Sequence, residues 1–132
     1  MKDRPQELAY YTAQMKRVEA LNARQPNSVI FDGWGSDMPE WYQQVGIVIS
    51  VSDHESFHLS IADGAASGAF PISLAWDGAD LIYPDPWLVS SIEEMADAIV
   101  NRPCQIESYQ AFVEENFKQE HVVQQMLAAM GL

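Results

Sequence analysis

The sequence predicts an α/β fold in which helices cover a parallel sheet. Two apolar runs suited to buried parallel strands, residues 47–51 and 70–74, flank a small-residue helical pattern over residues 57–67, which Gly68 ends. A polar corner, Ser52-Asp53-His54-Glu55, joins the first run to this helix. Because ligands of open parallel sheets bind where strands end and helices begin, we expect the function to reside at this corner.

Three elements are predicted before the corner. Apolar residues at helical spacing indicate a helix over residues 6–23. The short apolar run 29–31 is predicted as a strand, and a loop containing two glycines follows it. Residues 38–45 then form a short helix, which either Ser36 or Asp37 is able to cap.

Three helices are predicted after the second strand of the central unit. Ser90 and Ser91 each stand three residues before a glutamate, the pattern of a capping box, so a helix is expected from there to about residue 101. Residues 106–117 and 119–130 are expected to form two amphipathic helices. We expect one domain over residues 1–132, with residues 104–132 as closing C-terminal helices.

Length and charge limit the classes of function. The chain has 132 residues, and seven Lys and Arg against nineteen Asp and Glu give a net charge of −12. This charge repels phosphate backbones, so nucleic-acid binding is not expected. No run approaches the roughly 20 apolar residues of a membrane span. The single cysteine, Cys104, is typical of a reducing compartment, and we expect a cytoplasmic protein.

The corner satisfies a pattern of zinc hydrolases. His54-Glu55-Ser56-Phe57-His58 matches H-E-x-x-H, in which two histidines on one helical face bind zinc and the glutamate is the general base. His54 follows a strand almost at once, so we expect it in a loop. The next glutamate along the chain is Glu93, so a third ligand is not near in sequence. A zinc hydrolase is therefore a less favoured alternative.

A second interpretation pairs Glu55 with Asp63. Glu55 would lie at the end of the loop and Asp63 in the second turn of the helix, so both are able to face a ligand beside the helix N-terminus. Backbone N–H groups at Phe57, His58 and Leu59 would favour an anion, typically a phosphate. The alternative is that Asp63 is a solvated helix carboxylate and Glu55 a cap, and the residues alone leave both open.

The corner and its surroundings resemble the donor-binding half of retaining glycosyltransferases with the GT-B fold (glycosyltransferase group 1, family 4-like). In that family a strand leads into a Glu, a Gly-Phe-Gly-Leu-like turn, a second Glu eight positions after the first, and a small-residue run ending Gly-x-Pro. The corresponding residues here are Glu55, Ser56-Phe57-His58-Leu59, Asp63 and the segment 65–71. Residues 31–40 and 76–84 also resemble the family, so the resemblance covers nearly all of the chain.

This resemblance implies a Rossmann-like sheet from a truncated GT-B C-terminal domain. It implies that Glu55 contacts the donor sugar and steadies the positive charge that develops at the anomeric carbon. Asp63 would accept hydrogen bonds from the nucleotide ribose, and the amides of residues 57–59 would contact the diphosphate or sugar. Trp34 and Gly35 would lie near the base.

The sequence departs from the family pattern at the corner itself. Ser56 and His58 replace both glycines of the turn, and a histidine there is expected to crowd a ligand or add a hydrogen-bond donor. Asp63 is shorter than glutamate by one methylene group. Two residues, and not one, separate Gly68 from Pro71.

The resemblance also implies substrates and partners. A nucleotide-diphosphate sugar would be the donor of a hexose, with no cofactor and no metal needed for the chemistry. A missing N-terminal acceptor domain or partner chain would complete the enzyme, so we expect the isolated chain to be inactive. A partner chain or a second copy is expected to cover any unpaired sheet edge. The other alternative is a non-catalytic interaction module on the same fold.

Overall fold

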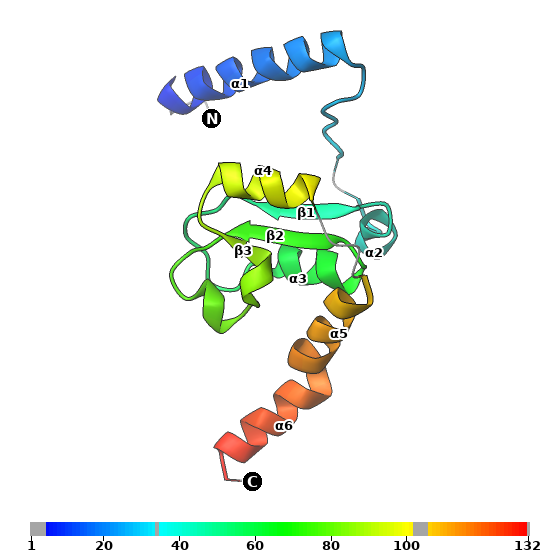
Figure 1. The fold of residues 1–132 in the computed structure, drawn as a ribbon, viewed down its shortest axis with the longest axis vertical. Coiled ribbons are helices and arrows are strands. Elements are labelled where there is room, and N and C mark those ends of the chain that lie inside the picture. The colour runs from blue at the N-terminus through cyan, green and yellow to red at the C-terminus, as the bar shows by residue number, and fades with distance from the viewer. Residues whose placement is uncertain (1–4, 34, 102–105, 132) are drawn as a thin grey trace. The chain divides into compact units, whose positions relative to one another are not determined.

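The computed structural model describes residues 5–33, 35–101 and 106–131. Trp34 and Cys104 therefore lie outside the described residues. Contacts within the chain divide it into two compact units, residues 1–36 and 37–132. The first unit contains helix α1 (Pro5–Arg24), drawn in blue in Figure 1.

The second unit contains a parallel sheet between helices. Its elements are α2 (Met38–Tyr42), β1 (Ile47–Ser50), α3 (Leu59–Ala66), β2 (Phe70–Leu74), two short 3₁₀ helices (Ala79–Leu81 and Asp85–Trp87), β3 (Leu88–Val89), α4 (Ile92–Val100), α5 (Ile106–Phe117) and α6 (Gln119–Ala129). The strand order is β1-β2-β3, all parallel. Figure 1 shows α3 and α4 on opposite faces of this sheet. The predicted class, α/β with helices flanking a parallel sheet, is confirmed.

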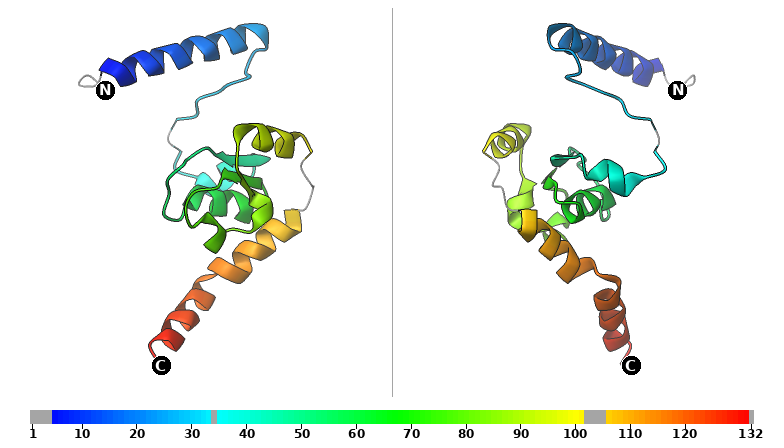
Figure 2. Two further views of the ribbon diagram at one scale, coloured as in Figure 1. Left: turned by 60° about the vertical axis from the view of Figure 1, so that its left-hand side comes forward. Right: turned by 90° about the vertical axis from the view of Figure 1, so that its right-hand side faces the viewer.

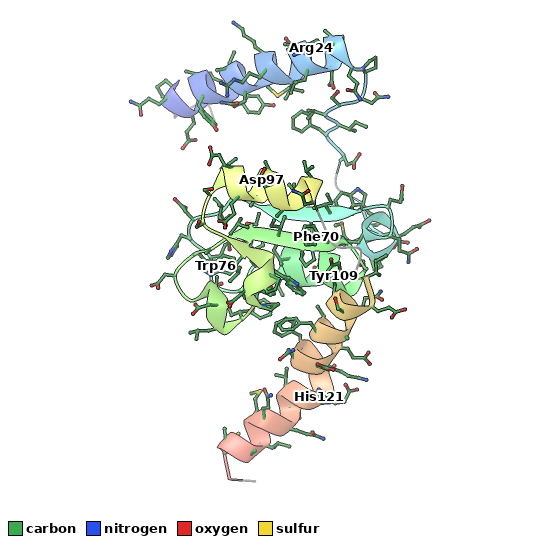
Figure 3. The ribbon with its side chains drawn as sticks, viewed as in Figure 1. Arg24, Phe70, Trp76, Asp97, Tyr109 and His121 are labelled. Carbon is green, nitrogen blue, oxygen red and sulfur yellow. The ribbon has the colours of Figure 1, made fainter. Side chains whose placement is uncertain are left out.

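Aromatic side chains form much of the core of the second unit. Trp76 and Trp87 are both buried. Trp76 lies beyond the carboxyl end of β2, whereas Phe70 and Tyr109 lie at its other end (Figure 3). Helix α5 packs against α3, and both views of Figure 2 show α6 leading away from the sheet. Different side chains therefore surround the two ends of the strands. The corner, residues 52–55, lies at the carboxyl end.

The strand predicted at residues 29–31 is wrong. The side-chain amide of Asn22 donates to Val29 O at 2.9 Å, and Val29 N donates to Asn22 Oδ1 at 2.9 Å. Both backbone groups of Val29 are therefore satisfied locally, and Ile30 and Phe31 are exposed. The third strand of the sheet is β3, whose two residues are too few to show a periodic pattern.

The predicted helix caps are confirmed in two places. The side chain of Asp37 accepts a hydrogen bond from Glu40 N at 3.2 Å at the start of α2. Ser91 Oγ accepts from Glu94 N at 3.1 Å at the start of α4. Glu94 Oε2 in turn accepts from both Ser90 N and Ser90 Oγ, at 2.7 Å each, and these two bonds lower the pKa of Glu94. The sequence allowed either Ser90 or Ser91 to cap this helix, and in the structure Ser91 is the cap.

Strand β1 lies at an edge of the sheet. Among the strands that the structure describes, only β2 pairs with it. Ile49, the last residue but one of the strand, and Val51, just after the strand, are exposed. Coverage of this edge by a partner or a second copy stays a prediction. Within the described ranges, no helix has both the length and the apolar character that a membrane crossing requires.

Candidate functional site at the turn before helix α3

Helix α3 is seated directly on β1 because a glycine faces the strand. A Cβ added to Gly64 would lie 2.4 Å from Val48 Cγ1, closer than real Cβ contacts. The small residue therefore permits the close approach of helix and strand. This packing places the N-terminus of α3 beside the carboxyl end of β1, with the corner residues between them.

The turn that enters α3 has an unusual backbone. The predicted helix begins two residues later than expected, at Leu59, and His58 is its N-cap with φ +60° and ψ +62°. This left-handed conformation costs an ordinary L-residue about 1–2 kcal/mol, although histidine tolerates it better than most. Ile61 N donates to His58 O at 3.0 Å, which closes the first turn. A histidine thus holds a backbone geometry that glycine adopts without strain.

The imidazole of His58 contacts the carboxylate of Glu55. Nδ1 of His58 lies 3.2 Å from Glu55 Oε1 and 3.4 Å from Ser50 Oγ. The ring of Trp76 lies beside it, with 5.9 Å between ring centroids. The side chain of His58 is 13% exposed and that of Glu55 is 33% exposed. The structure therefore brings these two predicted site residues together and leaves part of the carboxylate open to solvent.

Tyr83 supports the turn from the core, a role that sequence reasoning missed. Its hydroxyl donates to Phe57 O at 3.0 Å and to His58 O at 3.2 Å, and the residue is 2% exposed. Burial raises the pKa of Tyr83 to about 12, the negative charge of Asp63 adds to the increase, and a hydrogen bond with the Ala62 backbone opposes it. No local sequence pattern predicts this contact, because Tyr83 lies 25 residues after His58.

The other predicted site residues have different surroundings. Asp63 is exposed on α3, and its charge adds to the effect of burial in raising the pKa of Tyr42. Leu59, the first residue of α3, is exposed. Gly35 belongs to the first unit, and a Cβ added there would meet no atom within 4 Å. Its nearness to the base, like that of Trp34 outside the described residues, stays a prediction.

The structure does not support the zinc alternative. H-E-x-x-H chemistry requires both histidines on one face of a helix. Residues 53–57 are not helical, and helix α3 begins only after His58. Across the described ranges, no three His, Cys, Asp or Glu side chains are grouped as metal ligands.

The site combines an accepting carboxylate with a donating helix end. Glu55 is held on one side by His58 and is able to accept hydrogen bonds or stabilise positive charge. The first amides of an α-helix have no intrahelical acceptor and carry partial positive charge, which favours an anionic group. A ligand that carries both hydroxyl groups and a phosphate matches this combination.

Comparison with known protein families matches most of this chain to a family model. The family model described as "Glycosyl transferases group 1" matches residues 4–102, three quarters of the chain, including the corner, α3 and all three strands. Comparisons with curated proteins and with solved structures give no significant match.

Proposed function

Because the chain belongs to the family of group 1 glycosyl transferases, we propose that its corner binds a nucleotide-diphosphate sugar. In this proposal the chain supplies the donor-binding part of a retaining transferase with the GT-B fold, which moves a hexose to an acceptor. The turn of residues 52–58 and the first turn of α3 form the binding surface. The acceptor half of the enzyme would come from another domain or chain.

The left-handed turn at His58 is the observation that carries this proposal. The family pattern has a glycine at this position, and φ of +60° is a conformation that glycine adopts readily. The backbone of this turn is therefore one that a glycine at this position would accept, although the residue here is a histidine. Glu55 lies at the start of this turn, partly exposed, where it would contact the donor sugar and steady the charge at the anomeric carbon.

Asp63 and the N-terminus of α3 complete the proposed site. The first-turn amides would bind the diphosphate, because they favour negative charge. Asp63 would accept hydrogen bonds from the ribose hydroxyls. Its exposure on α3 leaves the carboxylate available for such a contact.

Ligand-detected NMR with a panel of UDP- and GDP-sugars tests the proposal. We expect saturation transfer to at least one nucleotide sugar, weakened at least fivefold in affinity by Glu55→Gln and by Asp63→Asn. Asp97→Asn, which removes an equivalent charge from an exposed position on α4, is the matched control and should leave binding unchanged. Binding that survives both variants contradicts the assignment of Glu55 and Asp63 to the donor site. Binding of no member of the panel contradicts the function and favours a non-catalytic interaction module.

A further inference from the structure

His58 has a left-handed backbone conformation, which costs free energy. Contacts of its side chain must therefore offset that cost. Among the described residues, Asn27 and His58 are the non-glycine residues with positive φ. The side chain of His58 makes no capping hydrogen bond to α3, so capping does not explain its presence. Its side chain contacts Glu55, Ser50 and the ring of Trp76. These contacts are the candidates for what the imidazole does.

The contact with Glu55 requires one particular tautomer of the ring. An ionised carboxylate only accepts hydrogen bonds, so Nδ1 of His58 must carry a hydrogen to bond Glu55 Oε1 at 3.2 Å. Ser50 Oγ, 3.4 Å from the same nitrogen, also accepts from Ser52 N at 3.3 Å. In the tautomer with a hydrogen on Nδ1, the ring donates toward Glu55, and Ser50 Oγ lies beside the same nitrogen.

We infer that His58 is a positioning residue, whose imidazole holds the Glu55 carboxylate in one place beside the N-terminus of α3. Ser50 and Trp76 are both buried, so the ring is fixed from the side of the sheet. A free glutamate side chain samples several rotamers, and ordering it on binding costs free energy. Because His58 orders Glu55 in advance, the donor sugar meets a fixed carboxylate. This role rests on the proposed function of the corner.

The variant His58→Gly separates this role from simple crowding. Glycine accepts φ of +60° without strain, so the turn is retained while the ring is removed. If the ring positions Glu55, the affinity for the nucleotide sugar that binds wild type falls by about tenfold. If the ring merely obstructs the ligand, affinity rises. His58→Asn, which tolerates the left-handed conformation and keeps an N–H donor, should recover part of the loss.

A double-mutant cycle with Glu55→Gln identifies the partner of the ring. Glu55→Gln should weaken binding strongly in wild type and much less in the His58→Gly background. Additive effects, or unchanged or tighter binding by His58→Gly, overturn the inference while the proposed function stands.

Urea unfolding of wild type, His58→Gly, Glu55→Gln and the double variant tests the contact between residues 55 and 58 without any ligand. Non-additive free energies of unfolding are expected from a direct Glu55–His58 interaction, and additive ones overturn it. If wild type binds no nucleotide sugar, the proposed function fails, and the donor-side role of His58 fails with it. The urea cycle still establishes or refutes the contact itself.

Discussion

The two ends of helix α3 pass through the same left-handed backbone region by different means. At the C-terminal end, Gly68 has φ +91°, Gly68 N donates to Ala65 O at 3.0 Å, and Ala69 N donates to Gly64 O at 2.9 Å. This is a Schellman motif, complete within six residues. At the N-terminal end, His58 has φ +60° and is held by side chains from other elements.

In the proposed function, this difference separates a structural end of α3 from the end that binds the donor. The C-terminal end needs only its own neighbours and the residue that suits the conformation best. The N-terminal end uses a more strained residue, and Tyr83 and Ser50 must be in place to support it. Strained backbone held by long-range contacts is typical of functional sites.

The largest expected effect is the loss of stability in alkali caused by Tyr83. Its pKa is about 12 in the folded protein against 10.0 ordinarily, so the unfolded chain loses this proton first as pH rises. The contribution, about 2–3 kcal/mol, is complete below pH 10 and is lost as pH rises through 12. Urea unfolding of wild type and Tyr83→Phe between pH 8 and 12 measures it. Parallel pH profiles for the two proteins would contradict the assignment.

Tyr83→Phe at neutral pH should destabilise the protein by about 1–3 kcal/mol, because the carbonyls of Phe57 and His58 lose a buried donor. Tyr10→Phe, at an exposed position of α1, is the control and should have no measurable effect. Thermal or urea unfolding gives both values. If Tyr83→Phe left the stability unchanged, the N-terminal turn would not depend on support from the core.

Gly68→Ala tests the C-terminal end and should cost about 1–2 kcal/mol. The alanine would keep an unfavourable φ, and its Cβ would lie 2.9 Å from Ile106 Cγ2. Gly33→Ala is the matched control, since its Cβ would meet no atom within 4 Å. Donor binding should be unchanged by Gly68→Ala under conditions where the variant is folded. Weaker binding would mean that the two ends are not functionally separate.

The smallest effect is expected on tyrosine titration, where Asp63→Asn should cause a modest decrease in the pKa of Tyr83 and of Tyr42. The charge of Asp63 is the second cause of both elevated values, after burial. Spectrophotometric titration of tyrosinate absorbance measures the change, and the Asp97→Asn variant should titrate like wild type. An unshifted pKa of Tyr83 in Asp63→Asn would place the Asp63 carboxylate away from the N-terminal end of α3.

The parts of the fold that could be predicted from sequence are those with local causes. Gly68 as a helix stop and Ser91 as a cap depend on neighbouring residues, and the runs of β1 and β2 are long enough to show a pattern. Residues 29–31 misled because an apolar run alone does not reveal that Asn22 already pairs with Val29.

The candidate site was only partly predictable. The carboxylate and histidine of the corner are visible in the sequence, and the resemblance identified His58 as standing in a glycine position, which its positive φ supports. The contact of His58 with Glu55 and the support from Tyr83 are not visible there. The first depends on the left-handed turn at His58, although the two residues are only three apart in sequence. The second arises from tertiary packing, which brings a residue far along the chain to the turn.

Chemical-shift mapping of backbone amides during a nucleotide-sugar titration tests the central claim most directly, because it observes both ends of α3 at once. We expect the amides from Glu55 to Leu59 to shift in a saturable manner, whereas those from Ser67 to Ala69 stay unchanged. Saturable shifts confined to the C-terminal end, or spread over the unit without the turn before α3, would contradict the claim that this turn is the donor site.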